Sequence, residues 1–122
     1  MERLITLLSR AAAEINELEV EAKRLLYENG DQQGYYLRLR QKAMLLSGLA
    51  DAVAELAPLP PRVNTLIQEK LGGFSFEADR ALRLDSVFYM GVLLCPEEHQ
   101  EGGANELEMF VRSLQEHLLA RD

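Results

Sequence analysis

The residues of this chain that could bind a metal ion gather between positions 95 and 99. They are Cys95, Glu97, Glu98 and His99. A zinc site needs four ligands, usually paired cysteines or histidines at regular spacing, and this segment offers one of each. Di-iron sites in helical bundles need Glu-x-x-His pairs, but neither histidine of the chain has a glutamate three positions before it. We therefore predict no metal site and no cofactor, with Cys95 as a buried thiol beside an exposed acidic loop.

Two carboxylate pairs near the N-terminus have the spacing of magnesium ligands. Glu14/Glu17 and Glu28/Asp31 resemble the Glu-x-x-Glu and Glu-x-x-Asp pairs of helical nucleotide pyrophosphatases. However, Glu28 and Asp31 lie on either side of Asn29-Gly30, where glycine favours the end of a helix. One helix would not present both carboxylates to one ion. We expect these residues to face solvent or to cap a helix.

An arginine and a histidine near the C-terminus form the remaining candidate for catalysis. The segment from Arg112 to His117 separates them by four residues, which resembles the motif of HEPN-type ribonucleases. These are small helical bundles that often dimerise. The resemblance implies RNA cleavage in a dimer cleft, with Arg112 and His117 as catalytic residues. Five helical steps place the two side chains about 140° apart around the axis, so a surface pair on an amphipathic helix explains them equally well.

The composition narrows the classes of partner. The net charge is −7, so the protein's electrostatic field repels phosphate, and binding to nucleic acid is disfavoured. No stretch reaches the roughly 18–20 apolar residues of a membrane span. The one cysteine cannot form an internal disulfide. We therefore expect a cytoplasmic protein that does not bind membranes and for which nucleic acid is a disfavoured partner, unless a local basic patch overrides the net charge.

The helices that carry these residues follow from the hydrophobic spacing. Apolar residues at intervals of four and three predict one helix over residues 2–28 and a second over 32–57. Because Gly30 and Asp31 form a tight turn, the two helices should pair as an antiparallel hairpin. Residues whose numbers sum to about 61 then face each other, which pairs Glu19 with Lys42 and Glu21 with Arg40. We expect these to be exposed pairs that select the register.

The second half of the chain predicts three further helices. Pro60 and Pro61 precede a short helix over residues 62–71, which Gly72-Gly73 should end. Ser75 would then cap a helix over 76–94. Its uncharged end, residues 87–95, should be buried on nearly every side. Asn105 and Glu108 resemble a capping box at the start of the last helix.

The chain is therefore predicted to be all-α, with residues 1–122 forming a single helical-bundle domain. This domain is an up-down bundle of four main helices and one short helix, built on the N-terminal hairpin. The outward seventh-residue positions of the first helix are Thr6, Ala13, Val20 and Tyr27, and the last three are hydrophobic. Aligned exposed apolar groups suggest a covering protein. We expect a partner or a second copy of the chain to bind Ala13, Val20 and Tyr27.

The sequence thus favours a non-enzymatic adaptor or regulatory module that works through protein–protein contacts. The HEPN-like ribonuclease with Arg112 and His117 is the alternative from a different class. Residues 1–57, with their acidic first helix and the Gly30-Asp31 turn, also resemble flagellar export chaperones. That resemblance implies a helical-hairpin chaperone as a third possibility.

Overall fold

The computed structural model describes residues 2–56, 59–95 and 104–119, with the backbone alone for 117–119. The described residues form helices and no strands. The helices are α1 (Glu2–Asn29), α2 (Gln32–Ser47), α3 (Leu49–Ala54), α4 (Pro61–Leu84), α5 (Val87–Val92) and α6 (Glu106–Leu119). Buried residues from all six helices belong to one hydrophobic core. The predicted all-α bundle built on an N-terminal hairpin is confirmed.

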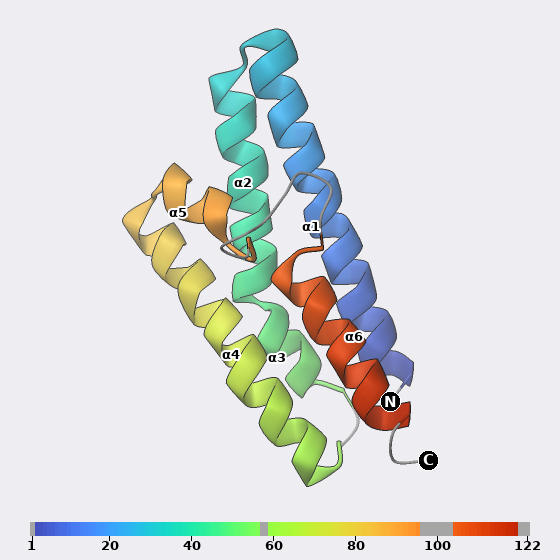
Figure 1. Cartoon of the computed structure of the whole chain (residues 1–122). Helices are drawn as coiled ribbons and strands as arrows, with labels where there is room; N and C mark the ends of the chain where they lie inside the picture. Colours follow the sequence, from blue (N-terminus) through green and yellow to red (C-terminus); the bar gives the residue numbers. More distant parts are fainter. Residues whose placement is uncertain (1, 57–58, 96–103, 120–122) are drawn as a thin grey trace.

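The hairpin of α1 and α2 forms for the local reasons read from the sequence. Gly30 adopts a left-handed backbone (φ 63°), which glycine tolerates without steric cost. The Asp31 carboxylate accepts a hydrogen bond from the Gly34 amide at 2.8 Å and so caps α2. Figure 1 shows α1 and α2 side by side, running in opposite directions from this turn.

The predicted helix over residues 32–57 is wrong at Gly48, where the structure has two helices. α2 ends at Ser47 and α3 begins at Leu49. Ser75 of α4 lies against this break, donating a hydrogen bond to the Leu46 carbonyl at 2.8 Å and accepting one from the Ala50 amide at 3.4 Å. A side chain that satisfies backbone groups in this way allows a helix to be interrupted inside a bundle.

The predicted helix end at Gly72-Gly73 is also wrong, because α4 runs through both glycines. Ser75 is consequently an interior residue and not an N-cap. Two interior glycines cost about 1 kcal/mol each relative to alanine. The buried face of α4 outweighs this cost, because it continues at helical spacing on both sides of the glycines. That face consists of Val63, Ile67, Leu71, Ala78 and Ala81.

The predicted helix over 76–94 ends ten residues early. Asp85 takes a left-handed conformation (φ 49°), and the Ser86 hydroxyl accepts a hydrogen bond from the Tyr89 amide to start α5. The expectation that residues 87–95 are buried on nearly every side is wrong as well. Phe88 is 71% exposed and Val92 is 45% exposed. A helix of six residues resting on α2 and α4 buries one side only, whatever its charge.

The hairpin organises the remaining helices. α2 contacts α1, α3, α4 and α5, as predicted for the central helix, while α6 packs on α1. Figure 1 shows α6 beside the half of α1 near the N-terminus, with the other half of α1 extending past it. No helix in the described residues is long and apolar enough to cross a membrane.

Candidate functional site

The three residues predicted to bind a partner all lie on the surface of α1. Ala13 is exposed, and Val20 and Tyr27 are 69% and 79% exposed. They stand seven residues apart, so they lie along one side of the helix, rotated by only about 20° per step. We call Ala13, Val20 and Tyr27 the α1 ridge. No described residue buries the α1 ridge, although full burial of a valine side chain such as that of Val20 is favourable by about 1.5–3 kcal/mol.

A row of charged residues runs beside the α1 ridge. Arg10, Glu17 and Arg24 are also seven residues apart and are exposed. These three charged residues come four positions after Thr6, Ala13 and Val20, respectively. One helical turn separates the members of each pair, so the charged residues all lie on the same side of the ridge. Arg24 also donates two hydrogen bonds to the Glu21 carboxylate, one turn earlier in the helix. These hydrogen bonds lower the pKa of Glu21, so the carboxylate stays charged.

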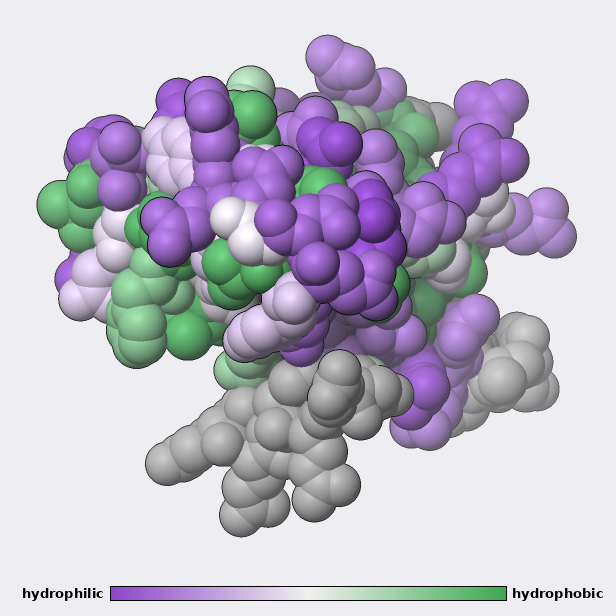
Figure 2. Space-filling view, turned by 90° about the horizontal axis from the view of Figure 1, so that it is seen from above, coloured by the Kyte–Doolittle hydropathy of each residue, from purple (hydrophilic) through white to green (hydrophobic). Residues whose placement is uncertain are grey.

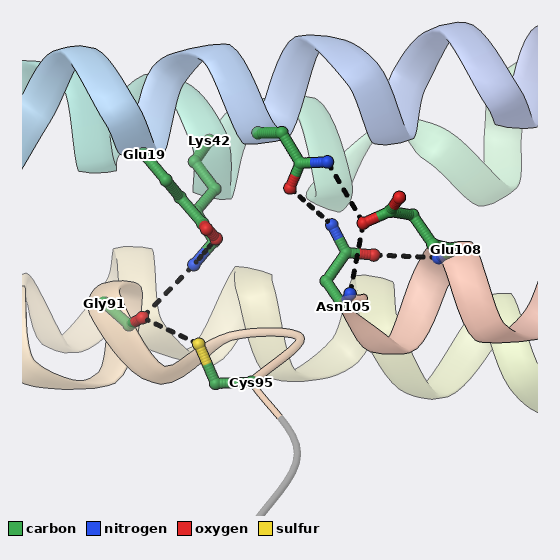
Figure 3. Close-up of polar contacts among 7 residues, drawn as sticks. Glu19, Lys42, Gly91, Cys95, Asn105 and Glu108 are labelled. Carbon is green, nitrogen blue, oxygen red and sulfur yellow. Dashed lines mark hydrogen bonds and ion pairs between the residues drawn. The ribbon is translucent and has the colours of Figure 1, made fainter. Parts of the chain in front are cut away.

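Inside the bundle, a polar cluster joins α1, α2 and the segment around α5 (Figure 3). Lys42 Nζ lies 2.8 Å from Glu19 Oε1 and donates a hydrogen bond to the Gly91 carbonyl at 3.2 Å. The Cys95 thiol shares that carbonyl at 3.5 Å. The Lys42 side chain is fully buried. The predicted pairing of Glu19 with Lys42 is thus confirmed, but its predicted exposure is wrong.

The geometry of this cluster suits a structural role. The Lys42–Glu19 contact is an ion pair without the angles of a hydrogen bond, so the two charges neutralise each other in a medium of low dielectric constant. Burial raises the pKa of the Cys95 thiol, and the nearby Lys42 charge opposes that rise only in part. A thiol that stays protonated is a poor nucleophile. Cys95 is only partly buried, less than predicted, and its raised pKa disfavours the reactive thiolate.

The predicted pair of Glu21 and Arg40 does not form. Glu21 pairs with Arg24 on its own helix. Arg40 lies 3.5 Å from Asp85, which follows α4. Asp85 also accepts a hydrogen bond from the Tyr36 hydroxyl, and this bond raises the pKa of Tyr36. The sum of about 61 predicts which residues of the hairpin lie at the same height. It does not predict whether a charged residue pairs across the hairpin, within its own helix or with a residue of another helix.

A second polar network, also drawn in Figure 3, joins α6 to α1. Asn105 and Glu108 exchange hydrogen bonds of 2.8 and 3.1 Å, which confirms the predicted capping box. The side chain of Asn16 on α1 completes the network by bonding Asn105 and Glu108 at 3.0 Å each. Asn105 is 1% exposed. The tertiary role of Asn16 is invisible in the sequence, where Asn16 is one polar residue among many on α1.

The remaining candidates for catalysis and metal binding are scattered or undescribed. Glu97, Glu98 and His99 lie outside the described residues, as does the His117 side chain, while Arg112 is exposed on α6. Glu14, Glu17 and Glu28 are exposed as well. Within the described residues, no three carboxylate, histidine or cysteine side chains are grouped to hold a metal ion.

Sequence reasoning missed an apolar surface on α4, α5 and α6. Figure 2 looks along the bundle from the end where α1 joins α2 and shows hydrophobic residues at the surface on the side of α4 and α5. Tyr89 lies under the Arg80 guanidinium at 5.7 Å and beside the Phe88 ring. Further along, α4 and α6 line a groove of about 670 Å³ with Leu66, Met109 and Phe110 among its walls. The uncharged segment 87–95 forms part of this surface, although its lack of charge predicts burial in the core.

No protein-family model, curated protein or solved structure matches this chain. The function of this protein is therefore inferred from the geometry of the chain itself.

Proposed function

We propose that this protein is a non-enzymatic protein-interaction module that binds a protein partner through the α1 ridge. The observation that carries the proposal is the alignment of Val20 and Tyr27, both more than two-thirds exposed, on one side of a 28-residue helix. Scattered apolar side chains are normal on a protein surface, but aligned ones favour an interface. Tyrosine is also enriched at protein interfaces.

The polar groups inside the bundle support a scaffold role over catalysis. The two buried polar side chains among the described residues, Lys42 and Asn105, are both occupied by internal contacts. An enzyme usually places reactive groups in a pocket that substrate can enter. We propose the cytoplasm as its compartment, because the single cysteine is a free thiol of the kind that reducing compartments preserve.

Affinity capture tests this proposal. Immobilised wild-type protein is expected to retain one or more partner proteins from an extract of the native host, and Tyr27→Glu should abolish retention because the new charge would be buried at the interface. Phe88→Glu is the matched control, since Phe88 is another exposed aromatic residue but lies on α5. Equal retention by all three proteins would contradict the role of the α1 ridge.

An RNA assay separates this function from the ribonuclease alternative. The purified wild-type protein is expected to leave a mixed RNA sample intact. Cleavage that is lost in both Arg112→Ala and His117→Ala variants would replace the interaction module with an enzyme.

A further inference from the structure

We propose that the partner bound by the α1 ridge is a second copy of this chain, with the two α1 helices packed antiparallel across a two-fold axis at the level of Val20. This inference rests on the proposed function, because it assigns the occupant of the same surface. It specifies a register, an orientation and a set of ion pairs that a different partner protein would not share.

The apolar residues of the α1 ridge are complementary to themselves in this orientation. When two copies of one helix pair antiparallel about Val20, each residue on the contact line faces the one whose number completes a sum of 40. Val20 then meets the partner's Val20, and Tyr27 meets the partner's Ala13. The large ring lies over the smallest side chain of the ridge at both ends, which is the alternation that close packing requires. A parallel pair would instead set Tyr27 against the partner's Tyr27.

The charged row beside the α1 ridge selects the same orientation. Antiparallel helices bring residues on the same side of the contact line together, as equivalent flanking positions do in antiparallel coiled coils. Glu17 then lies within one residue of the level of the partner's Arg24, an offset of about 1.5 Å along the helix, and the two-fold axis repeats this pair. Arg24 keeps donors for a second carboxylate, because guanidinium carries five N–H groups and the bonds to Glu21 use two of its nitrogens.

The outer residue of the row follows the same pattern. Arg10 faces the end of the partner's α1, where Glu28 is exposed on the last turn and Asp31 follows it. A parallel pair would bring Arg24 against the partner's Lys23 and so place like charges together. Opposite charges set orientation and exclude other alignments more than they add affinity.

The position of α6 is also compatible with an antiparallel pair. Asn16 accepts a hydrogen bond from Asn105 and donates one to Glu108, which places the start of α6 near the middle of α1. From there α6 runs toward the N-terminus of α1 (Figure 1), so the part of α1 that carries Tyr27 projects beyond it. In the antiparallel pair the projecting half of each copy faces the flanked half of the other. The two α6 helices stay at opposite ends and do not meet.

Cross-linking tests the register directly. In a Cys95→Ser background, Val20→Cys is expected to form a disulfide-linked dimer, because Val20 lies at the two-fold axis. Ala13→Cys and Tyr27→Cys should cross-link when mixed and much less when each is alone. Leu37→Cys is the matched control, an exposed position on α2 that is not part of the ridge. Efficient cross-linking of Ala13→Cys with itself, or of the Leu37→Cys control, would overturn the antiparallel register.

A charge exchange tests the ion pairs in solution. Light scattering after size exclusion should give the wild type a mass twice 13.8 kDa. Glu17→Arg is expected to weaken the dimer about tenfold, because the variant sets two arginines against each other. Adding Arg24→Glu should restore affinity to within about threefold of the wild type, since the exchanged pair again joins opposite charges. Glu69→Arg, the same charge change on α4, should have no effect.

The outcomes separate this inference from the proposed function. A wild-type protein that stays at 13.8 kDa at the highest soluble concentration overturns self-pairing. If a different protein is then still captured and Tyr27→Glu abolishes that capture, the proposed function stands with another occupant. If Val20→Glu and Tyr27→Glu change neither mass nor capture, both proposals fail. A Glu17→Arg variant that is not rescued by Arg24→Glu overturns the antiparallel ion pairs.

Discussion

Glu19 and Lys42 form an ion pair of 2.8 Å that is shielded from solvent between α1 and α2, with the Lys42 side chain fully buried. Through the Gly91 carbonyl, the same ammonium group reaches the segment that carries α5. The pair therefore sets the register of the hairpin and also holds α5 against it. Desolvation of both charges offsets much of their attraction, so the pair contributes more to specificity than to net stability.

Lys42→Met should lower the free energy of unfolding by about 3 kcal/mol, because it leaves the Glu19 carboxylate without a counter-charge in the interior. Urea denaturation followed by circular dichroism measures this change. Adding Glu19→Gln to Lys42→Met should recover part of the loss, since the double variant buries no charge. Lys23→Met, at an exposed position of α1, is the control and should be close to neutral. An equally neutral Lys42→Met would mean that the pair is solvated.

Gly72→Ala and Gly73→Ala should each stabilise the protein by about 0.5–1 kcal/mol. Both glycines lie in the interior of α4, no atom outside the helix lies within 4 Å of an added Cβ, and alanine has the higher helix propensity. Thermal melts measure the effect. Gly34→Ala is the contrasting variant and should destabilise, because its Cβ would overlap the Asp31 carboxylate. A loss of stability in Gly72→Ala and Gly73→Ala would indicate that the chain breaks at these residues after all.

Asn105→Ala should cost about 1–2 kcal/mol of folding free energy, since it removes a helix cap and leaves the Asn16 amide without one of its partners. Chemical denaturation provides the measurement, with Asn64→Ala at an exposed position of α4 as the control. Amide hydrogen exchange should become faster at the start of α6 before it changes in α2. Uniform exchange along the whole chain would contradict a local role for this network.

The Cys95 thiol should ionise at a higher pH in the folded protein than in urea, because burial raises its pKa. A raised folded pKa favours the neutral thiol, so its contribution to stability is complete below the unfolded pKa and is lost as the pH rises through the folded one. The rate of reaction with a thiol reagent, measured against pH, reports both values. Lys42→Met should raise the folded pKa further, because it removes the nearby positive charge. Identical profiles for folded and unfolded protein would rule out a buried thiol.

The hairpin and its ion pair show how much local pattern alone can predict. The spacing of apolar residues, the glycine with a left-handed backbone and the capping aspartate all act within a few residues. These residues are sufficient to define α1, the turn and the start of α2. The Asn105–Glu108 capping box is local in the same sense, and the structure confirms it.

The errors arose where contacts with distant residues outweigh local preference. Gly72 and Gly73 predict a break, but burial on both sides of them keeps α4 continuous. Ser75 is a good N-cap by type, yet its hydroxyl binds the backbone at the α2–α3 break. Phe88 and Val92 lie in an uncharged segment, but a short helix on the outside of the bundle cannot bury them.

By itself, the order of residues determined which segments are helical near the N-terminus and how they turn, since these depend on periodicity and capping. Only the tertiary structure decided that Lys42 is buried, that Asn16 joins α6 to α1, and that half of α1 projects beyond α6. The reason is physical: burial and long-range hydrogen bonds depend on where several helices meet, and no single helix carries that information.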